Sequence, residues 1–236
     1  MTPRPALIVF CREPLAGRTK TRLFTHLPPR DAAALADAFI VDTLAKAAKI
    51  RPGRLVIAGT SGSCVAESAY FRTLKRRFDA ELLDQGGGSL GARMARALGA
   101  FARDCGALLV GTDLPSLPLA ALSRLYALLQ RHPLVLGPSL DGGYYAVGAR
   151  GEVPPIFTGI RWGSARVFTE TVKRIKLAKW PLAIGPVWHD VDRWADLVLL
   201  CGYLRHLEAG ASRPHYHPCP ATARILKRLG LLPRRR

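Results

Sequence analysis

Short apolar runs alternate with helical stretches through the first half of the sequence, and this alternation restricts the fold more than any other feature. Continuous apolar runs such as ALIVF and ALLV are typical of strands buried on both faces of a sheet. Repeated units of strand, helix and strand favour a mostly parallel sheet with right-handed crossovers. Strands are predicted at residues 6–10, 54–59, 80–84, 107–110 and 134–139. The sequence therefore predicts an α/β protein.

The stretches between these runs carry apolar residues at helical spacing, as Leu35, Phe39 and Leu44 do within residues 30–49. With 236 residues, the chain is long enough to bury roughly 70% of its unfolded surface in one domain. No internal repeat or low-complexity linker divides it, so residues 1–236 are expected to form a single domain. Further helices are predicted over residues 64–78, 89–101, 119–130, 164–175 and 194–207.

The sequence ALLVGTDLPSLP ends a predicted strand abruptly, because Pro115 cannot continue the pairing of a sheet. In open α/β sheets, ligands bind outside the carboxyl ends of the strands. Asp113 is therefore a candidate catalytic or metal-binding acid. A structural role, in which Asp113 only stabilises a turn, is the alternative.

The loop after the first predicted strand, CREPLAGRTKTRL, is both flexible and basic. Gly17 permits unusual backbone angles, while Arg18, Lys20 and Arg22 supply charge and hydrogen-bond donors. A loop in this place is the usual phosphate position of an α/β unit. We therefore predict that it binds the phosphates of a nucleotide, although a basic surface turn would have the same composition.

A glycine-rich loop, QGGGS, precedes a predicted helix that Ser89 can cap. Glycines let a ligand approach the backbone closely, here at Gly87. The side chain of Gln85 can donate to and accept from a base edge, and Arg93 can reach a phosphate. A flexible hinge explains the three glycines equally well.

The sequence LDGGYY lies between two apolar runs, which is typical of a tight hairpin turn. That turn explains Asp141, Gly142 and Gly143 without any function. The functional alternative is that Asp141 faces a polar acceptor beside Tyr144.

Two further residues of the second half are candidates for ligand contacts. Trp162 can stack on a sugar or base, and packing in the core is its alternative role. Asp192 precedes a predicted helix, where it can cap the helix or meet a divalent cation. The segment from His215 to Cys219 has metal-binding residue types but lacks a second cluster, so we predict a proline-stiffened loop there.

The formal net charge of +18 arises from 35 Lys and Arg residues against 17 Asp and Glu residues. Such a charge concentrates anions around any cleft. The basic residues are spread along the chain without a nucleic-acid-binding module, so specific nucleic-acid binding is not expected. The basic C-terminal end, which includes Lys227, Arg228 and Arg234 to Arg236, is compatible with a peripheral contact to anionic membranes, although such ends are commonly only solvated.

The sequence also predicts a cytoplasmic location. No stretch approaches twenty apolar residues, and the N-terminus leads directly into a short strand rather than a signal peptide. The five cysteines are scattered, which suits reduced thiols.

Six stretches together resemble a known bacterial family. The chain looks like the radical-SAM/selenodomain-associated transferases, which are GT-A-type glycosyltransferases linked to arsenosugar synthesis. It is more distantly similar to phospholactate and molybdenum-cofactor guanylyltransferases. The likeness runs from about Leu7 to Leu197 and rests on CREPLAGRTKTRL, QGGGSLGARM, GTDLPSLP, LGPSLDGGYYAVG, IFTGIRWGSARVFTETV and WHDVDRWADL.

This resemblance implies a nucleotide-diphospho-sugar transferase fold, a three-layer α/β/α sandwich with a mixed, mostly parallel sheet. It implies a nucleotide-binding half in residues 1–110, a metal and acceptor half in residues 111–210, and a basic extension in residues 211–236. By position, Gly17, Arg18, Lys20 and Arg22 fall in the phosphate loop, Gln85 and Gly87 in the base-side loop, Asp113 and Asp192 at the metal, and Asp141, Gly142 and Gly143 at the acceptor turn.

One departure from the family of glycosyltransferases concerns the metal. The usual Asp-x-Asp is absent after the central strand, where only Asp113 stands. The literal Asp190-Val191-Asp192 lies elsewhere in the sequence and is not taken as its equivalent. A single acid is closer to the pattern of nucleotidyltransferases.

The leading hypothesis is a transferase, dependent on Mg²⁺ or Mn²⁺, that passes a glycosyl group from a nucleotide sugar to a small or lipid-like acceptor. In it, Asp113 and Asp192 hold the metal, Lys20 and Arg22 clamp the leaving pyrophosphate, and Asp141 is a base or acceptor orienter. The alternatives are nucleotidyl transfer from a nucleoside triphosphate, and a non-catalytic protein that binds nucleotides or acidic partners.

Overall fold

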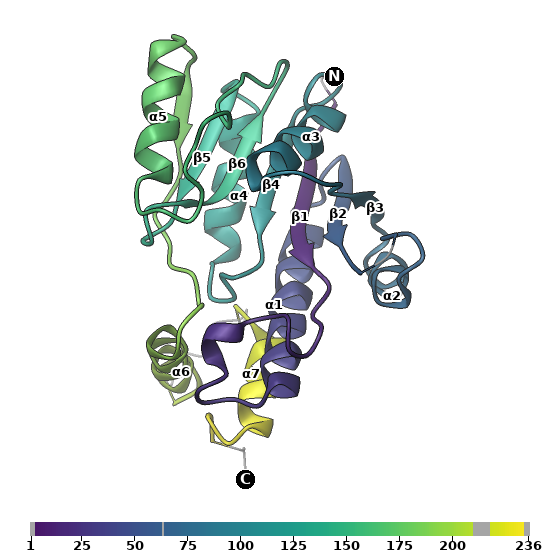
Figure 1. The fold of residues 1–236 in the computed structure, drawn as a ribbon, viewed down its shortest axis with the longest axis vertical. Coiled ribbons are helices and arrows are strands. Elements are labelled where there is room, and N and C mark those ends of the chain that lie inside the picture. The colour runs from purple at the N-terminus through teal and green to yellow at the C-terminus, as the bar shows by residue number, and fades with distance from the viewer. Residues whose placement is uncertain (1–2, 63, 210–217, 234–236) are drawn as a thin grey trace.

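A seven-stranded sheet forms the centre of the computed structural model, which describes residues 3–62, 64–209 and 218–233 (Figure 1). Its strand order is β3-β2-β1-β4-β6-β5-β7. The strands are β1 (Ala6–Arg12), β2 (Arg54–Thr60), β3 (Glu81–Asp84), β4 (Ala107–Gly111), β5 (Leu134–Pro138), β6 (Tyr144–Ala149) and β7 (Leu182–Ile184). Four of the strand pairings are parallel, namely β1 with β2, β1 with β4, β2 with β3, and β5 with β7.

Strand β6 runs against its neighbours and makes the sheet mixed. It pairs antiparallel with both β4 and β5. The hairpin turn at Asp141 and Gly142 reverses the chain, as the sequence LDGGYY predicted. The predicted α/β class with a mixed, mostly parallel sheet is thus confirmed.

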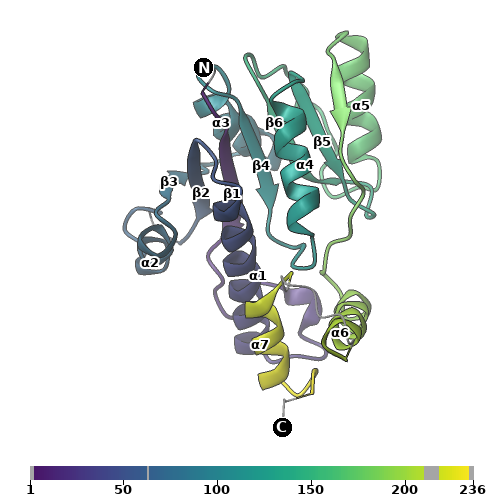
Figure 2. The ribbon, with the colours of Figure 1, turned by 180° about the vertical axis from the view of Figure 1, so that it is seen from behind.

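Helices cover both faces of the sheet (Figures 1 and 2). One core cluster joins α1, α2 and α4 to one face, and a second joins α3 and α5 to the other. Along β1 the residues alternate between the two clusters, with Leu7 in the first and Ile8 in the second. The helices are α1 (Pro29–Lys49), α2 (Ala69–Phe78), α3 (Leu90–Ala102), α4 (Leu119–Leu129), α5 (Val167–Leu177), α6 (Trp194–Ala209) and α7 (Pro220–Arg228).

A third apolar cluster lies beyond the carboxyl ends of the parallel strands (Figure 1). It packs the 3-10 helix η1 (Thr21–Leu23), the first half of α1, α6 and α7 around buried residues such as Leu23, Phe39 and Leu204. This cluster fixes the loop before η1 and the loop before α6 at the same end of the sheet.

Two helix starts differ from the predictions for local reasons. Helix α2 begins at Ala69 rather than residue 64, because the hydroxyl of Ser68 accepts from the backbone N–H of Phe71 and caps it. Helix α5 begins at Val167, because the hydroxyl of Ser164 donates to Arg161 O in the preceding turn. Ser89 caps α3 as predicted.

The predictions for the C-terminal part meet the structure only in places. Residues 215–217 and 234–236 lie outside the described part of the chain, whereas Cys219 is buried at the start of α7. No helix of the described residues is long and apolar enough to cross a membrane.

A buried polar network ties α1 to α7 and to the loop that follows Asp113. On α1, Asp42 accepts from Ala221 N, Thr222 N and Thr222 Oγ1, and so caps the start of α7. One turn later, Lys46 Nζ donates to Pro115 O at 2.7 Å and to Leu117 O at 3.0 Å. Sequence patterns gave no sign of either contact, because the partners are far apart in the chain.

This network predicts a pH effect on stability at Lys46. Burial lowers the pKa of Lys46 to about 8, and the nearby carboxylate of Asp42 opposes this shift. Between pH 8 and the ordinary value of 10.5, the unfolded chain therefore binds more protons than the folded one, and this contribution makes the free energy of unfolding rise with pH, by up to roughly 3 kcal/mol.

Lys46→Met removes that contribution, so the variant is expected to lose stability relative to the wild type as pH rises from 7 to 10. Urea unfolding at several pH values measures this, with the exposed Lys49→Met on the same helix as control. A difference in stability between wild type and Lys46→Met that stays constant over this range would contradict the prediction.

Candidate active site

A cavity of about 760 Å³ opens where the carboxyl ends of β1, β2 and β4 meet the first residues of β6. This is the edge of the sheet at which a ligand is expected in an open α/β fold. Its walls come from the loop after β1, the end of β4, the start of α3 and the loop before α6. Each segment that the sequence assigned to the nucleotide or to its metal therefore contributes to this one cavity. The acceptor turn at residues 141–143 does not line it.

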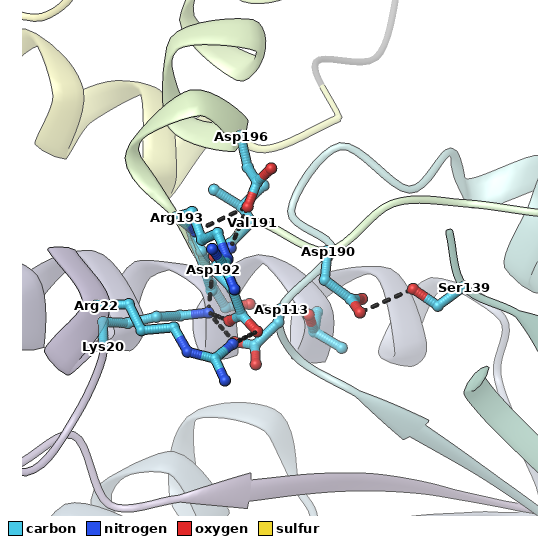
Figure 3. Close-up of polar contacts among 11 residues, drawn as sticks. Lys20, Arg22, Asp113, Ser139, Asp190, Val191, Asp192, Arg193 and Asp196 are labelled. Atoms are coloured by element: carbon cyan, nitrogen blue, oxygen red, sulfur yellow. Dashed lines mark hydrogen bonds and ion pairs between the residues drawn. The ribbon is translucent and has the colours of Figure 1, made fainter. Parts of the chain in front are cut away.

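Two carboxylates meet at this cavity around one cation (Figure 3). Lys20 Nζ lies 2.6 Å from Asp113 Oδ1 and 2.7 Å from Asp192 Oδ1. The loop before α6 reaches Asp113 because Val191 N donates to Asp113 O at 2.8 Å. The two acids that the sequence proposed as metal ligands are thus brought together, although 79 residue positions separate them.

The capping role that sequence reasoning allowed for Asp192 is wrong. The carboxylate of Asp196 accepts from Asp192 N and Arg193 N, and so caps the start of α6 (Figure 3). The Asp192 side chain points instead toward Lys20 and Arg22. Because another acid caps the helix, Asp192 is available to the cavity.

Asp190 is a cavity residue that sequence reasoning set aside. Ser139 Oγ donates to Asp190 Oδ2 at 2.8 Å (Figure 3). Burial raises the pKa of Asp190 to about 7; the bond from Ser139 opposes this shift, and the carboxylates of Asp141, Asp113 and Asp192 add to it. The sequence signal for Asp190 is the motif Asp190-Val191-Asp192. It was not taken as a metal motif because it lies far from the central strand in the sequence.

The basic loop lies against the cavity as expected. Arg18, Lys20 and Arg22 line it, and so does Arg12, which the sequence did not single out. The guanidinium of Arg22 lies 3.6 Å from Asp192 Oδ2, and its side chain is 65% exposed, so a phosphate in the cavity can reach it. Gly17 has a φ of 82°, which is the conformation that favours glycine.

The glycine-rich loop is fixed by hydrogen bonds rather than free to hinge. Gln85 Nε2 donates to Cys11 O and Ala58 O, and the side chain is buried. Arg96 donates to Gln85 O and Gly87 O from the next helix. The amide nitrogen of Gln85 is therefore engaged in the fold, and only its carbonyl oxygen is left for the proposed base contact.

Arg93 lines the cavity and also donates to Gly88 O at 3.0 Å. Its place beside the glycine-rich loop is the one the sequence proposed. A phosphate or ribose that enters the cavity along α3 would meet this guanidinium.

The acceptor residues are only partly brought together. Tyr144 lines the cavity, whereas Asp141 is exposed and accepts from Gly143 N inside its own turn. Trp162 packs edge-on against Tyr144 and against the helix face at Gly91, and it is not among the residues that line the cavity. For Trp162, the packing role that the sequence left open is the one its contacts favour.

The sheet order, the helical layers and the position of this cavity define a nucleotide-diphospho-sugar transferase fold of the GT-A type. Residues 43–164 match the family DUF2064, described as an uncharacterized protein conserved in bacteria. The match covers more than half of the chain, and the chain belongs to this family. No curated protein matches the sequence.

Solved structures support the same fold. A proposed nucleotide-diphospho-sugar transferase from Desulfovibrio desulfuricans G20 is 28% identical, with a TM-score of 0.78 and 97% of each chain covered. A CMP:2-keto-3-deoxy-manno-octonic acid synthetase in complex with CTP is 10% identical, with a TM-score of 0.52 over 86% of this chain and 99% of that one. A 4-diphosphocytidyl-2C-methyl-D-erythritol synthase from Anaerococcus prevotii DSM 20548 is 8% identical, with a TM-score of 0.53 over 85% and 98%. The last two similarities concern the fold alone.

Proposed function

We propose that the protein is a divalent-metal-dependent transferase that takes a glycosyl group from a nucleotide sugar and passes it to a small or lipid-like acceptor. One observation carries this proposal: Asp113 and Asp192 converge on a single cation in a cavity walled by the basic loop. The 28% identity to the Desulfovibrio protein over nearly the whole chain supports it. The same proposal includes a relation to the radical-SAM/selenodomain-associated transferases, a link to arsenosugar synthesis and a cytoplasmic location.

The donor atoms at this position suit Mg²⁺ or Mn²⁺. The ammonium of Lys20 is a stand-in cation there, and its partners are two carboxylate oxygens and the carbonyl oxygen of Val191, at 2.6 to 2.8 Å. Oxygen donors of this kind are the ligands that hard cations prefer. A bound cation would supply positive charge opposite the leaving diphosphate.

The remaining residues have roles that follow from their places. Asp113 and Asp192 form an acid pair in the cavity. Arg18 and Arg22, on the wall beside this acid pair, bind the phosphates of the donor. Arg93 and the side-chain carbonyl of Gln85 line the side of the cavity on which we place the nucleoside. Asp141, at the turn that precedes β6, orients the acceptor.

Nucleotidyl transfer from a nucleoside triphosphate is the second candidate, and a specific feature favours it. Only one acid, Asp113, stands at the end of β4, because Gly111 occupies the position of the first acid in the Asp-x-Asp of glycosyltransferases. Both reactions use a cationic loop and a divalent metal, and they differ in the bond that breaks.

The products separate the two reactions. With a panel of nucleotide sugars, Mn²⁺ and acceptors, a glycosyltransferase releases nucleoside diphosphate, with slow hydrolysis when the acceptor is missing. With nucleoside triphosphates, a nucleotidyltransferase releases pyrophosphate. We expect nucleoside diphosphate. Asp113-dependent pyrophosphate release without turnover of any nucleotide sugar would make nucleotidyl transfer the function, and nucleotide binding without either product would indicate a non-catalytic protein.

A further inference from the structure

The ammonium group of Lys20 is buried between the two acids and one backbone carbonyl. Its side chain is only 5% exposed, and Nζ contacts Asp113 Oδ1, Asp192 Oδ1 and Val191 O (Figure 3). Nζ donates hydrogen bonds to Asp192 Oδ1 and Val191 O, and it forms an ion pair with Asp113 Oδ1. The group also lies 5.3 Å from the centre of the Phe39 ring. In this arrangement the ammonium of Lys20 is held by the two acids rather than offered to a phosphate.

The same three oxygens are those we propose for the divalent cation. An ammonium and a divalent cation cannot share one position, and two positive charges a few ångströms apart repel each other strongly away from bulk water. Lys20 and the metal therefore exclude each other at Asp113 and Asp192.

We infer that Lys20 is the resident counterion of the acid pair, and that it yields the pair to a divalent cation only when a nucleotide supplies phosphates as its new partner. This inference rests on the proposed function. It assigns Lys20 a part in the order of binding: the metal binds together with the nucleotide, and weakly without it.

The surroundings of Lys20 support both halves of this exchange. A largely buried ammonium is costly to leave unpaired, so Lys20 holds the acids until another anion is near. The acid side chains are 47% and 38% exposed toward the cavity, which leaves a path for a cation from solvent. Arg18 and Arg22 flank Lys20 on the same wall, so a diphosphate bound there lies within reach of a rotated lysine side chain.

The backbone at Lys20 is in a conformation that a lysine seldom adopts. Its φ of 52° and ψ of 40° place it in the left-handed region, directly before η1. Such conformations persist where the surrounding contacts hold them, and they are common at sites that switch. Lys20 O accepts from Leu23 N at 2.9 Å, so the residue is anchored at the start of η1 through its backbone while Nζ contacts the acids.

Lys20→Met tests the inference by binding alone. The variant lacks the ammonium, so Asp113 and Asp192 are open to Mn²⁺, and Mn²⁺ measured by electron paramagnetic resonance is expected to bind about tenfold more tightly than to the wild type without nucleotide. Arg12→Met is the matched control, because it removes one positive charge from the same cavity and Arg12 is no partner of the acid pair. Its Mn²⁺ affinity is expected to stay close to that of the wild type.

The double variant Lys20→Met with Asp113→Asn identifies the site, because the gained Mn²⁺ binding must disappear in it. Where Met at this buried position impairs folding, as thermal melting would reveal, Lys20→Gln gives the same comparison with a polar side chain. For the wild type, UDP, CDP, GDP and ADP tested in turn are expected to include one that raises Mn²⁺ affinity.

The outcomes separate the two proposals. Equal, Asp113-dependent Mn²⁺ affinity in the wild type and in Lys20→Met would overturn the counterion role and leave the metal site standing. Absence of Asp113-dependent Mn²⁺ binding in both proteins, alone and with each nucleotide, would overturn the metal site and the counterion role together.

Discussion

Replacement of Asp113 by asparagine is expected to lower turnover by about 100-fold or more while leaving the fold intact. The amide keeps the size of the side chain but loses the charge that a hard cation requires. A metal supplies several kcal/mol of charge stabilisation in such reactions, and about 1.4 kcal/mol corresponds to a factor of ten in rate. Because the side chain is 47% exposed, its replacement creates no buried cavity.

Loss of Mn²⁺-dependent nucleotide binding, followed by calorimetry, tests the same assignment without knowledge of the acceptor. Asp104→Asn is a suitable control, since it removes an exposed acid outside the lining of this cavity. Asp192→Asn should reproduce the loss seen for Asp113→Asn. Unchanged Mn²⁺-dependent affinity in Asp113→Asn would refute the assignment of this acid to the metal.

Much of the fold and part of the site could be predicted because their signals are local. A continuous apolar run such as residues 107–110 reports burial on both faces, and a break at Asp113 reports the end of a strand. The hairpin before β6 follows from Asp-Gly, and the cap of α3 follows from Ser89. Each of these depends on neighbours in the sequence.

The arrangement of the charged groups could not be predicted in the same way. Lys20 was proposed as a phosphate ligand, and its pairing with Asp192 spans 172 positions in the sequence. Asp196, rather than Asp192, caps α6, and Asp190 is an additional cavity acid that the sequence did not single out. Such contacts are decided by the third apolar cluster, which brings η1 and α6 together, and no local pattern reports it.

Gly142→Ala is expected to cause the largest loss of stability at the acceptor turn. Gly142 has a φ of 87°, and an added Cβ would lie 2.1 Å from the backbone oxygen of Ala165. Its own carbonyl accepts from Phe168 N at 2.8 Å, which joins the turn to the first turn of α5. Left-handed backbone costs roughly 1–2 kcal/mol for a residue with a Cβ, and forced overlap adds roughly 1–3 kcal/mol.

Gly151→Ala is the matched control for this variant, because Gly151 also has a φ of 87° but has open space where a Cβ would lie. The control should lose only the backbone contribution, while Gly142→Ala loses both. At about 2–4 °C per kcal/mol for a domain of this size, the melting temperature of Gly142→Ala should fall several degrees below that of Gly151→Ala. Equal melting temperatures would mean that the turn moves away from α5 without cost, and it could then not hold Asp141 in a fixed place beside the cavity.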